Sequence, residues 1–187
     1  MSVDKPSAKF SQAKEKVPAQ FEALFLEHWP RVYAVLFRLM GDHAEAEDLA
    51  LETFIKVYRS YPAQDATFNL GGWLYRVATN LGLNAIRDRK RRQRYEQEAG
   101  RVDWLGEQAN GPAELFAAEE QRQLARKVLG EMSPRQAQLL VLRYAGQPYK
   151  EIAAALGVSP TSIGPLLVRA EQEFEKRFRA AEQGGRG

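Results

Sequence analysis

The stretch YKEIAAALGVSPTSIGPLLVRA, residues 149–170, decides the fold of the C-terminal part of the chain. Apolar side chains recur at three- and four-residue steps on both sides of Gly157, a pattern typical of two helices packed together. Gly157 supplies the positive φ of a tight turn, and Ser159 followed by Pro160 is a helix cap with a first helical residue. The side chains expected to pack the two helices are Ile152, Ala153, Leu156, Val158, Ile163 and Leu166.

The second helix of this helix-turn-helix arrangement carries no charge in its first turns. If the helix began at Pro160, the proline at position 165 would remove one backbone hydrogen bond and crowd the preceding turn. We therefore expect an irregular segment at about residues 161–164 and a regular helix from Pro165 to about Ala180. The buried seam of that helix should consist of Leu167, Ala170, Phe174 and Phe178.

The outward surface of this second helix is formed by Ser159, Thr161, Ser162, Gly164, Pro165 and Val168. It lacks the charged and amide groups that read base edges in a DNA groove. Backbone amides at the helix start, together with Arg169, remain available to hold a phosphate. We therefore expect the element to recognise DNA by shape and phosphate, or to bind a partner. The candidate DNA-contacting residues are Ser159, Thr161, Ser162 and Arg169.

The rest of the chain shows the same periodicity, without the sustained alternation that would predict a strand, so the sequence predicts an all-α fold. Pro112 can begin one helix, and Ser133 with Gln136 forms a capping-box pattern before the next. The helices predicted before these span residues 19–40, 44–58 and 73–94.

The periodic pattern weakens after Arg94, where glycine, asparagine and charged residues mix without an apolar stripe. We place a linker at residues 95–120, joining two small helical domains at residues 19–94 and 121–180. Trp104 falls within this linker, where it can still dock on a neighbouring domain or a partner.

The 187 residues are 44% hydrophobic and 27% charged, the balance of a folded protein, with a formal net charge of +3. The absence of cysteine excludes disulfides, thiolate metal sites and cysteine nucleophiles. His28 and His43 fall in different segments without a paired acid and base, so we expect neither catalysis nor a metal or cofactor. Without a signal segment or a long apolar run, the chain is predicted to be cytoplasmic, with no membrane insertion.

The predicted helix at residues 44–58 has two different faces. Its core side should consist of Leu49, Thr53, Phe54 and Val57. The opposite side carries Asp48 and Glu52 beside Leu51 and Ile55. Carboxylates near a helix start are favoured by the helix dipole, so this side could be plain solvated surface. A strip that mixes acidic and apolar side chains nevertheless suits a protein interface better.

The predicted helix at residues 73–94 combines an apolar stripe with a polar line. The stripe consists of Leu70, Leu74, Val77 and Leu81, and the polar line of Arg76, Asn80, Asn84, Arg87 and Arg91. Amides and guanidinium groups on one line can contact phosphates and base edges. Trp73 and Tyr75 could stack on an unpaired base, although such aromatic residues more often belong to a core. The run RDRKRRQR, residues 87–94, holds six basic residues and one acidic residue, which favours phosphate contact.

These segments together resemble a known family. AEDLALETFIKVYRSY, residues 46–61, and FNLGGWLYRVATNLGLNAIRDRKRR, residues 68–92, resemble region two of the extracytoplasmic-function group of bacterial sigma factors. LGEMSPRQAQLLVLRYAGQPYKEIAAALGVSPTSI, residues 129–163, resembles region four of that group. The resemblance covers most of the chain in the expected order. It implies a protein that directs RNA polymerase to promoters and starts transcription without catalysing a reaction itself.

The resemblance also implies partners. Asp48 and Glu52 correspond to a helix that docks on core RNA polymerase, and Leu51 stands where the group usually has glutamine. The resemblance therefore assigns Asp48, Leu51, Glu52 and Ile55 to polymerase binding. Promoter DNA is the second implied partner, and an anti-sigma factor is a further candidate.

The implied DNA contacts differ between the two regions. The line with Asn80, Asn84 and Arg87 matches the group's surface for the minus-ten promoter element, where bases are unstacked and held in pockets. The loop at residues 62–72 would help to form such a pocket. In region four, similar proteins usually present Lys, Ser and Arg where this chain has Gly164 to Leu166, so their base contacts are not carried over.

Two other functions are compatible with the sequence. A regulatory protein could keep the fold and bind polymerase or an anti-sigma factor without directing initiation, an alternative motivated by the uncharged recognition helix. A plain helix-turn-helix regulator would never contact polymerase, and the strip around Asp48 argues against it.

Overall fold

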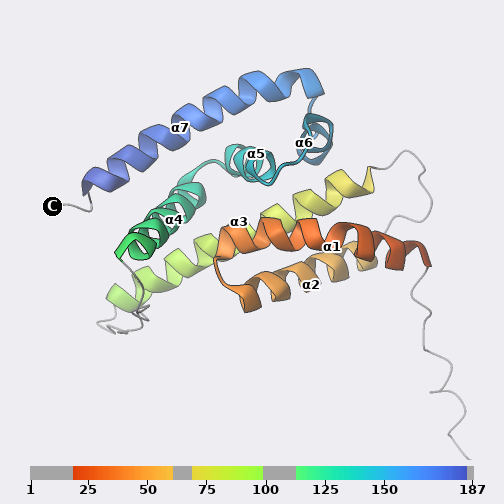
Figure 1. Ribbon diagram of the computed structural model, residues 1–187, viewed down its shortest axis with the longest axis horizontal. Helices are drawn as coiled ribbons and strands as arrows, with labels where there is room; N and C mark the ends of the chain where they lie inside the picture. The colour runs from red at the N-terminus through yellow and green to blue at the C-terminus, as the bar shows by residue number, and fades with distance from the viewer. Residues whose placement is uncertain (1–18, 61–68, 99–112, 185–187) are drawn as a thin grey trace, which may run out of the picture.

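The computed structural model describes residues 19–60, 69–98 and 113–184, and every regular element in these ranges is helical (Figure 1). The all-α prediction is therefore confirmed over the described ranges. The first three helices are α1 (Ala19–Met40), α2 (His43–Ser60) and α3 (Leu70–Glu98). They are followed by α4 (Ala113–Glu131), α5 (Pro134–Tyr144), α6 (Tyr149–Leu156), the short 3₁₀ helix η1 (Pro160–Ser162) and α7 (Ile163–Gly184).

The helices α1, α2 and α3 enclose the N-terminal part of the core. The core side predicted for α2 is confirmed, since Thr53, Phe54 and Val57 are buried and Leu49 is partly buried. The ring of Phe54 lies 4.7 Å from that of Phe25 and 5.9 Å from that of Trp29, both on α1. Burying large aromatic side chains in this way is a main source of stability for a three-helix unit.

The start of α3 differs from the prediction, which placed Gly71 and Gly72 in a loop. Both glycines are helical, because Oδ1 of Asn69 accepts a hydrogen bond from the Gly72 amide at 2.7 Å and caps the first turn. A Cβ on Gly72 would lie only 2.8 Å from Cβ of Ala154 on α6. Glycine at this position therefore permits a close helix contact, and the composition alone wrongly suggested a break.

The helix-turn-helix is confirmed. Gly157 adopts φ 63° between α6 and η1, and Ile152, Ala153 and Ile163 are buried together. The predicted seam of α7 is also confirmed, with Leu167 and Ala170 buried and with Phe174 and Phe178 packed against the core.

Two local predictions in this half need correction. Residues 160–162 form the 3₁₀ helix, but α7 begins at Ile163 and ends at Gly184, so Gly164 is helical. Pro165 is then the third residue of α7, in a first turn whose amides have no intrahelical partner, and it does not break the helix. Ser133 precedes α5 as predicted, but its hydroxyl bonds Oε1 of Gln136 at 2.7 Å, and no side-chain cap forms.

The helix α3 is central to the molecule. It contacts α1 and α2 on one side and α4, α5 and α6 on another, as Figure 1 shows. The apolar stripe predicted for it is therefore incomplete: Leu74 is buried, Leu70, Val77 and Leu81 are only partly buried, and Tyr75, Ala78, Leu83 and Ile86 are buried as well. A helix that is covered from two sides buries more than one stripe.

The predicted linker falls partly outside the described ranges. Residues 95–98 belong to α3 and residues 113–120 to α4, whereas Pro112 and Trp104 lie outside the described residues. The division into two domains with these boundaries remains a prediction. No single helix within the described ranges is long and apolar enough to cross a membrane, although α6 and residues 160–184, bent by 101°, meet that test of length and composition together.

Candidate nucleic-acid and protein interfaces

The outer face of α2 is exposed along its length. Asp48 and Glu52 are exposed, and the apolar Leu51 and Ile55 beside them are 44% and 49% exposed. Tyr58, which is 37% exposed, extends the same face by another turn. Sequence reasoning missed this tyrosine, although its spacing of three residues from Ile55 was a usable signal. We call the five residues the α2 outer face.

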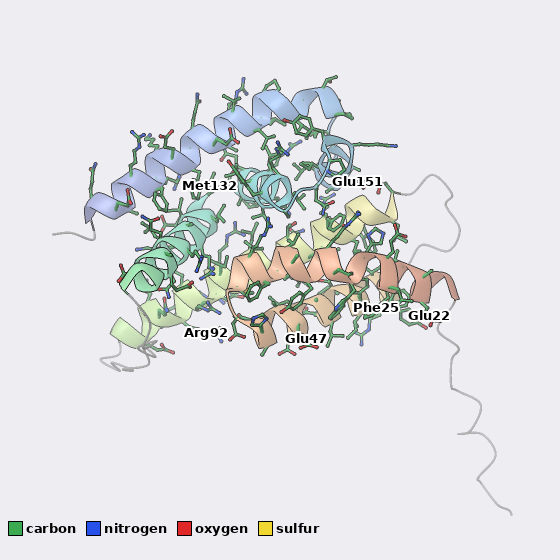
Figure 2. All side chains as sticks on the ribbon, viewed as in Figure 1. Glu22, Phe25, Glu47, Arg92, Met132 and Glu151 are labelled. Atoms are coloured by element: carbon green, nitrogen blue, oxygen red, sulfur yellow. The ribbon has the colours of Figure 1, made fainter. Side chains whose placement is uncertain are left out.

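The start of α2 is capped and carries a carboxylate in its first turn. Oδ1 of Asp42 accepts a hydrogen bond from the Glu45 amide at 2.8 Å, and carboxylates in the first turn are favoured by the helix dipole. Glu45 also pairs with Arg89 of α3, which connects the two helices. Glu52 pairs with Lys56 at 3.2 Å on the surface. In Figure 2, Glu47 lies on the outer edge of α2, away from the helices α4 to α7.

The polar line of α3 exists as predicted, but parts of it are already engaged. Arg76, Asn80, Asn84 and Arg91 are exposed and Arg87 is half-buried. Arg91 pairs with Asp88 at 3.1 Å on α3 itself. Nη1 of Arg87 donates to Oδ1 of Asn84 at 3.4 Å. The side chains of Asn80 and Arg87 also contact α5 and α4 respectively, through Gln138 and the carbonyl of Gly130.

The two aromatic residues at the start of α3 belong to the core in this conformation. Trp73 is partly buried against it, and Tyr75 is only 1% exposed, so the Tyr75 ring is not available for stacking on a base. The Tyr75 hydroxyl lies 3.4 Å from Nδ1 of His28. Burial raises the pKa of Tyr75, an effect that Arg31 and Gln147 partly oppose. His28 and Tyr75 therefore act in packing.

The surface of the helix-turn-helix is as poor in charge as the sequence predicts. Ser159, Thr161, Val168 and Arg169 are exposed, and Ser162 is half-buried. The Ser159 hydroxyl lies 3.0 Å from that of Thr161 and 2.7 Å from that of Ser162, so Ser159 joins the three hydroxyls into one cluster. Arg169 is the charged side chain nearest in sequence to this hydroxyl cluster on α7.

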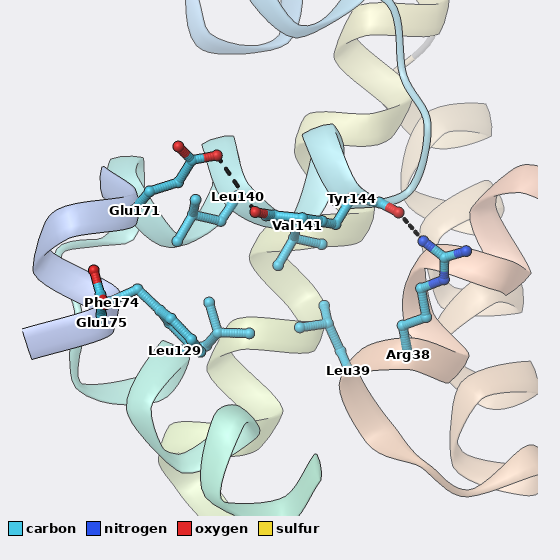
Figure 3. A pocket seen from close by; sticks show the side chains of 9 residues that line it. All are labelled: Arg38, Leu39, Leu129, Leu140, Val141, Tyr144, Glu171, Phe174 and Glu175. Atoms are coloured by element: carbon cyan, nitrogen blue, oxygen red, sulfur yellow. Dashed lines mark hydrogen bonds between the residues drawn. The ribbon is translucent and has the colours of Figure 1, made fainter. Parts of the chain in front are cut away.

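A cavity of about 520 Å³ opens where the end of α1 meets α4, α5 and α7 (Figure 3). The side chain of Arg38 donates to the carbonyl of Tyr144, and the Tyr144 hydroxyl donates to Oε1 of Glu171 at 3.4 Å. Burial and the Glu171 carboxylate raise the pKa of Tyr144. Sequence reasoning missed this cavity because its walls come from four helices. The lining residues are Arg38, Leu39, Leu129, Leu140, Val141, Tyr144, Glu171, Phe174 and Glu175.

Comparison with known proteins identifies the class. The family model for Sigma-70 region 2 matches residues 24–92, and the model for Sigma-70, region 4 matches residues 122–174. The ECF RNA polymerase sigma factor SigE of Mycolicibacterium smegmatis is 32% identical over 156 residues, which cover 82% of this chain and 60% of SigE. The RNA polymerase sigma factor CarQ of Myxococcus xanthus is 31% identical over 160 residues, covering 83% of this chain and 86% of CarQ.

Two solved structures share the fold. The sigma factor RpoE of Bartonella quintana, in complex with the anti-sigma factor NepR, aligns with a TM-score of 0.50 at 22% identity over 86% of this chain and 97% of that one. CnrH, in complex with the cytosolic domain of CnrY, aligns with a TM-score of 0.53 at 16% identity over 87% and 89%. This chain belongs to the sigma-70 family of RNA polymerase sigma factors, and within it to the extracytoplasmic-function (ECF) group. It spans 60% of SigE and 43% of SigG of Mycobacterium tuberculosis.

Proposed function

We propose that this chain is a promoter-specificity subunit of RNA polymerase, which recruits the core enzyme to promoters and opens DNA there. Membership of the ECF group supports the proposal, and the observation that carries it is the α2 outer face. The core polymerase performs the chemistry, and this chain supplies recognition.

The α2 outer face has the composition of a docking surface. Leu51 and Ile55 expose large apolar side chains beside Asp48 and Glu52. Apolar side chains at the centre of an interface supply burial, and surrounding carboxylates select a basic partner and speed its association. We assign this face to a basic surface of the core polymerase.

The proposed DNA contacts lie in both predicted domains, residues 19–94 and 121–180. In the first, the polar line of α3 would hold the minus-ten element, with Asn80 and Asn84 directed to bases and Arg76, Arg87 and Arg91 to phosphates. Trp73 is the proposed stacking residue, which requires its ring to leave the core when DNA binds. In the second, the hydroxyl cluster at Ser159 and the guanidinium of Arg169 would hold the backbone of the upstream element.

A regulatory role without initiation is the second candidate, and the uncharged surface of the helix-turn-helix favours it. Without charged or amide side chains at the groove, recognition of an upstream element is weak. An anti-sigma factor is among the proposed partners in either case, because the solved structure of the related RpoE contains one.

Reconstituted transcription separates these functions. The purified chain and core polymerase are incubated with a pool of random DNA fragments, and the transcripts are sequenced from their 5′ ends. A promoter-specificity subunit yields defined start sites that require the chain. A regulator that binds polymerase without directing initiation yields none but co-purifies with the core enzyme, and a plain helix-turn-helix regulator binds DNA without the core enzyme.

A further inference from the structure

The cavity between α1, α4, α5 and α7 is walled mainly by hydrocarbon side chains (Figure 3). Its apolar wall consists of Leu39, Leu129, Leu140, Val141 and Phe174. The first residue of this wall is 1% exposed, and the ring of Phe174 stacks on that of Phe178 with 5.6 Å between their centroids. A volume of about 520 Å³ is in the range that holds a small organic molecule. Water between such walls finds few hydrogen-bond partners, so an apolar body displaces it readily.

Charged side chains lie at two sides of this cavity. Figure 3 shows Glu171 and Glu175 of α7 at one side and Arg38 of α1 at the other. The Arg38 side chain donates to the carbonyl of Tyr144, so its guanidinium already has an acceptor. Two carboxylates against one guanidinium give the lining a net charge of −1.

The two carboxylates differ in their partners. Glu175 pairs with Arg179 one turn further along α7, so its charge is already compensated. Glu171 accepts a hydrogen bond from the Tyr144 hydroxyl at 3.4 Å, and no lysine or arginine in the described part of the chain pairs with it. Burial and the Glu171 carboxylate raise the pKa of Tyr144, so the hydroxyl stays protonated at neutral pH and continues to donate. One carboxylate at the edge of an apolar cavity therefore lacks a cation.

We propose that this cavity binds a small amphipathic amine, with its ammonium group beside Glu171 and its hydrocarbon body against Leu129, Leu140 and Phe174. The ammonium would form a charge-assisted hydrogen bond with the carboxylate, and the hydrocarbon would be removed from water. A neutral amphiphile would gain only the burial, and an anionic one would be repelled by Glu171. The cavity shares no lining residue with the α2 outer face or the polar line of α3, so this site is independent of the proposed function.

Isothermal titration calorimetry with a set of simple amphiphiles tests the site on the full chain. The probes are hexylamine, octylamine and decylamine, with 1-octanol and octanoate as controls of equal chain length and different charge. Octylamine should bind about three- to fivefold more tightly than 1-octanol, the contribution of a partly exposed ion pair. Octanoate should bind more weakly than either. Each added methylene should tighten binding by up to about fourfold while the chain still fits the cavity.

Glu171→Gln removes the charge and keeps the shape of the side chain. Because Glu171 is exposed, the variant should fold, which circular dichroism verifies. Octylamine affinity should fall by about three- to fivefold, and 1-octanol affinity should stay unchanged. Glu175→Gln is the matched control on the same helix, because Arg179 already compensates that carboxylate, and it should change octylamine affinity much less.

A second measurement locates the bound amine, because the α2 outer face also combines carboxylates with apolar side chains. Nuclear Overhauser effects between the methylene protons of octylamine and the ring protons of Phe174 would place the ligand in the cavity. Effects to Leu51 and Ile55 alone would place it on α2 and overturn the inference.

Three other results would also overturn the inference. They are equal affinity for octylamine and 1-octanol, tighter binding of octanoate than of octylamine, and unchanged selectivity in Glu171→Gln. A second copy of the chain filling the cavity would appear as a dimer in sedimentation and would leave no amine binding, with the same consequence. If Glu171→Gln does not fold, the comparison of octylamine with 1-octanol on the wild-type chain decides. None of these measurements involves polymerase or DNA, so failure of this inference and failure of the proposed function are distinguishable.

Discussion

The α2 outer face and the polar line of α3 are predicted from the same kind of pattern, yet only the first is fully open. On both helices, side chains three and four residues apart share one side. Asp48 and Ile55 face outward, and no helix of the described ranges packs over them, whereas Asn80 and Arg87 contact α5 and α4. Helical spacing identifies residues that share a side. What covers that side depends on residues from elsewhere in the chain.

The largest effect is expected on the open face. Asp48→Lys with Glu52→Lys should weaken binding to core polymerase by about 2–4 kcal/mol, because two ammonium groups would then replace the two carboxylates and repel a basic partner. A pull-down titration measures the affinity, and circular dichroism should show unchanged helix content since both residues are exposed. Glu120→Lys is the control for charge reversal, because Glu120 is exposed on α4, away from the α2 outer face. Equal affinity of the wild type and the double variant would remove this assignment.

The α2 helix was predictable because its core and exposed sides are local. Leu49, Thr53, Phe54 and Val57 alternate with the outer face within one helix, and the structure buries one set and exposes the other. The helix-turn-helix was predictable for the same reason, since Gly157 and its neighbours determine the turn within a few residues. In both places the residues that determine the structure lie within a few positions of one another in the sequence.

The start of α3 and the contacts of its polar line depend on distant residues. Gly72 is helical because Asn69 caps the turn, and glycine is tolerated there where α6 approaches. The partners of Arg87 and Asn80 are 43 and 58 residues away in the sequence. Periodicity within one helix carries no information about such partners, so sequence reasoning found the residues of the candidate site and missed their contacts.

Truncating Arg87 should weaken the contact with DNA at the promoter, and it should also loosen a contact between helices in the free chain. With polymerase, Arg87→Ala removes a phosphate contact, so the free energy of open-complex formation should become less favourable by about 1–3 kcal/mol. The slope of log affinity against log salt concentration should fall by about one unit. Asn80→Ala should act in the same direction without changing the salt slope. In the free chain, Arg87→Ala also removes the bond to Gly130 and should loosen the contact with α4.

Permanganate footprinting measures the unpaired thymines for both variants, and the pull-down titration tests whether polymerase binding is retained. Normal permanganate reactivity in Arg87→Ala and Asn80→Ala would show that the polar line of α3 does not hold the separated strand. Arg91→Ala separates loss of a phosphate contact from loosening of the contact with α4: Arg91 pairs with Asp88 within α3, so this variant should lower permanganate reactivity without disturbing α4.

Loosening the contact between α5 and α3 should have a smaller effect, in the opposite direction. Gln138→Ala removes the hydrogen bond to Asn80, and a neutral hydrogen bond contributes about 0.5–1.5 kcal/mol net. Binding of single-stranded promoter DNA by the free chain should therefore tighten by roughly two- to tenfold, measured by anisotropy. Gln136→Ala is the control, since Gln136 lies on the same helix and bonds Ser133 instead. Equal tightening in both variants would mean that the bond to Asn80 is not responsible.

The smallest effect on stability is expected at Gly164 and Pro165. The structure places Pro165 in the first turn of α7, where a proline does not break the helix. Because Pro165 lies in the first turn of α7, replacing the pair with Lys and Ser restores an amide that has no intrahelical partner. A Cβ on Gly164 would meet no atom within 4 Å, so the helix accommodates the new side chain. The free energy of unfolding should therefore change by only about 0.5 kcal/mol, measured in denaturant.

The same double substitution should still tighten binding to the upstream promoter element, because a lysine at this position adds a phosphate contact that the uncharged surface lacks. The wild-type chain should show shallow penalties across single-base variants of that element, well below the ~1–3 kcal/mol of a base pair that is read directly. Salt dependence should persist, since Arg169 is exposed and available to the backbone. Sharp penalties at two or more adjacent positions with the wild-type chain would show that the serine and threonine hydroxyls at positions 159–162 read bases, and that a helix without charge in its first turns can select a promoter.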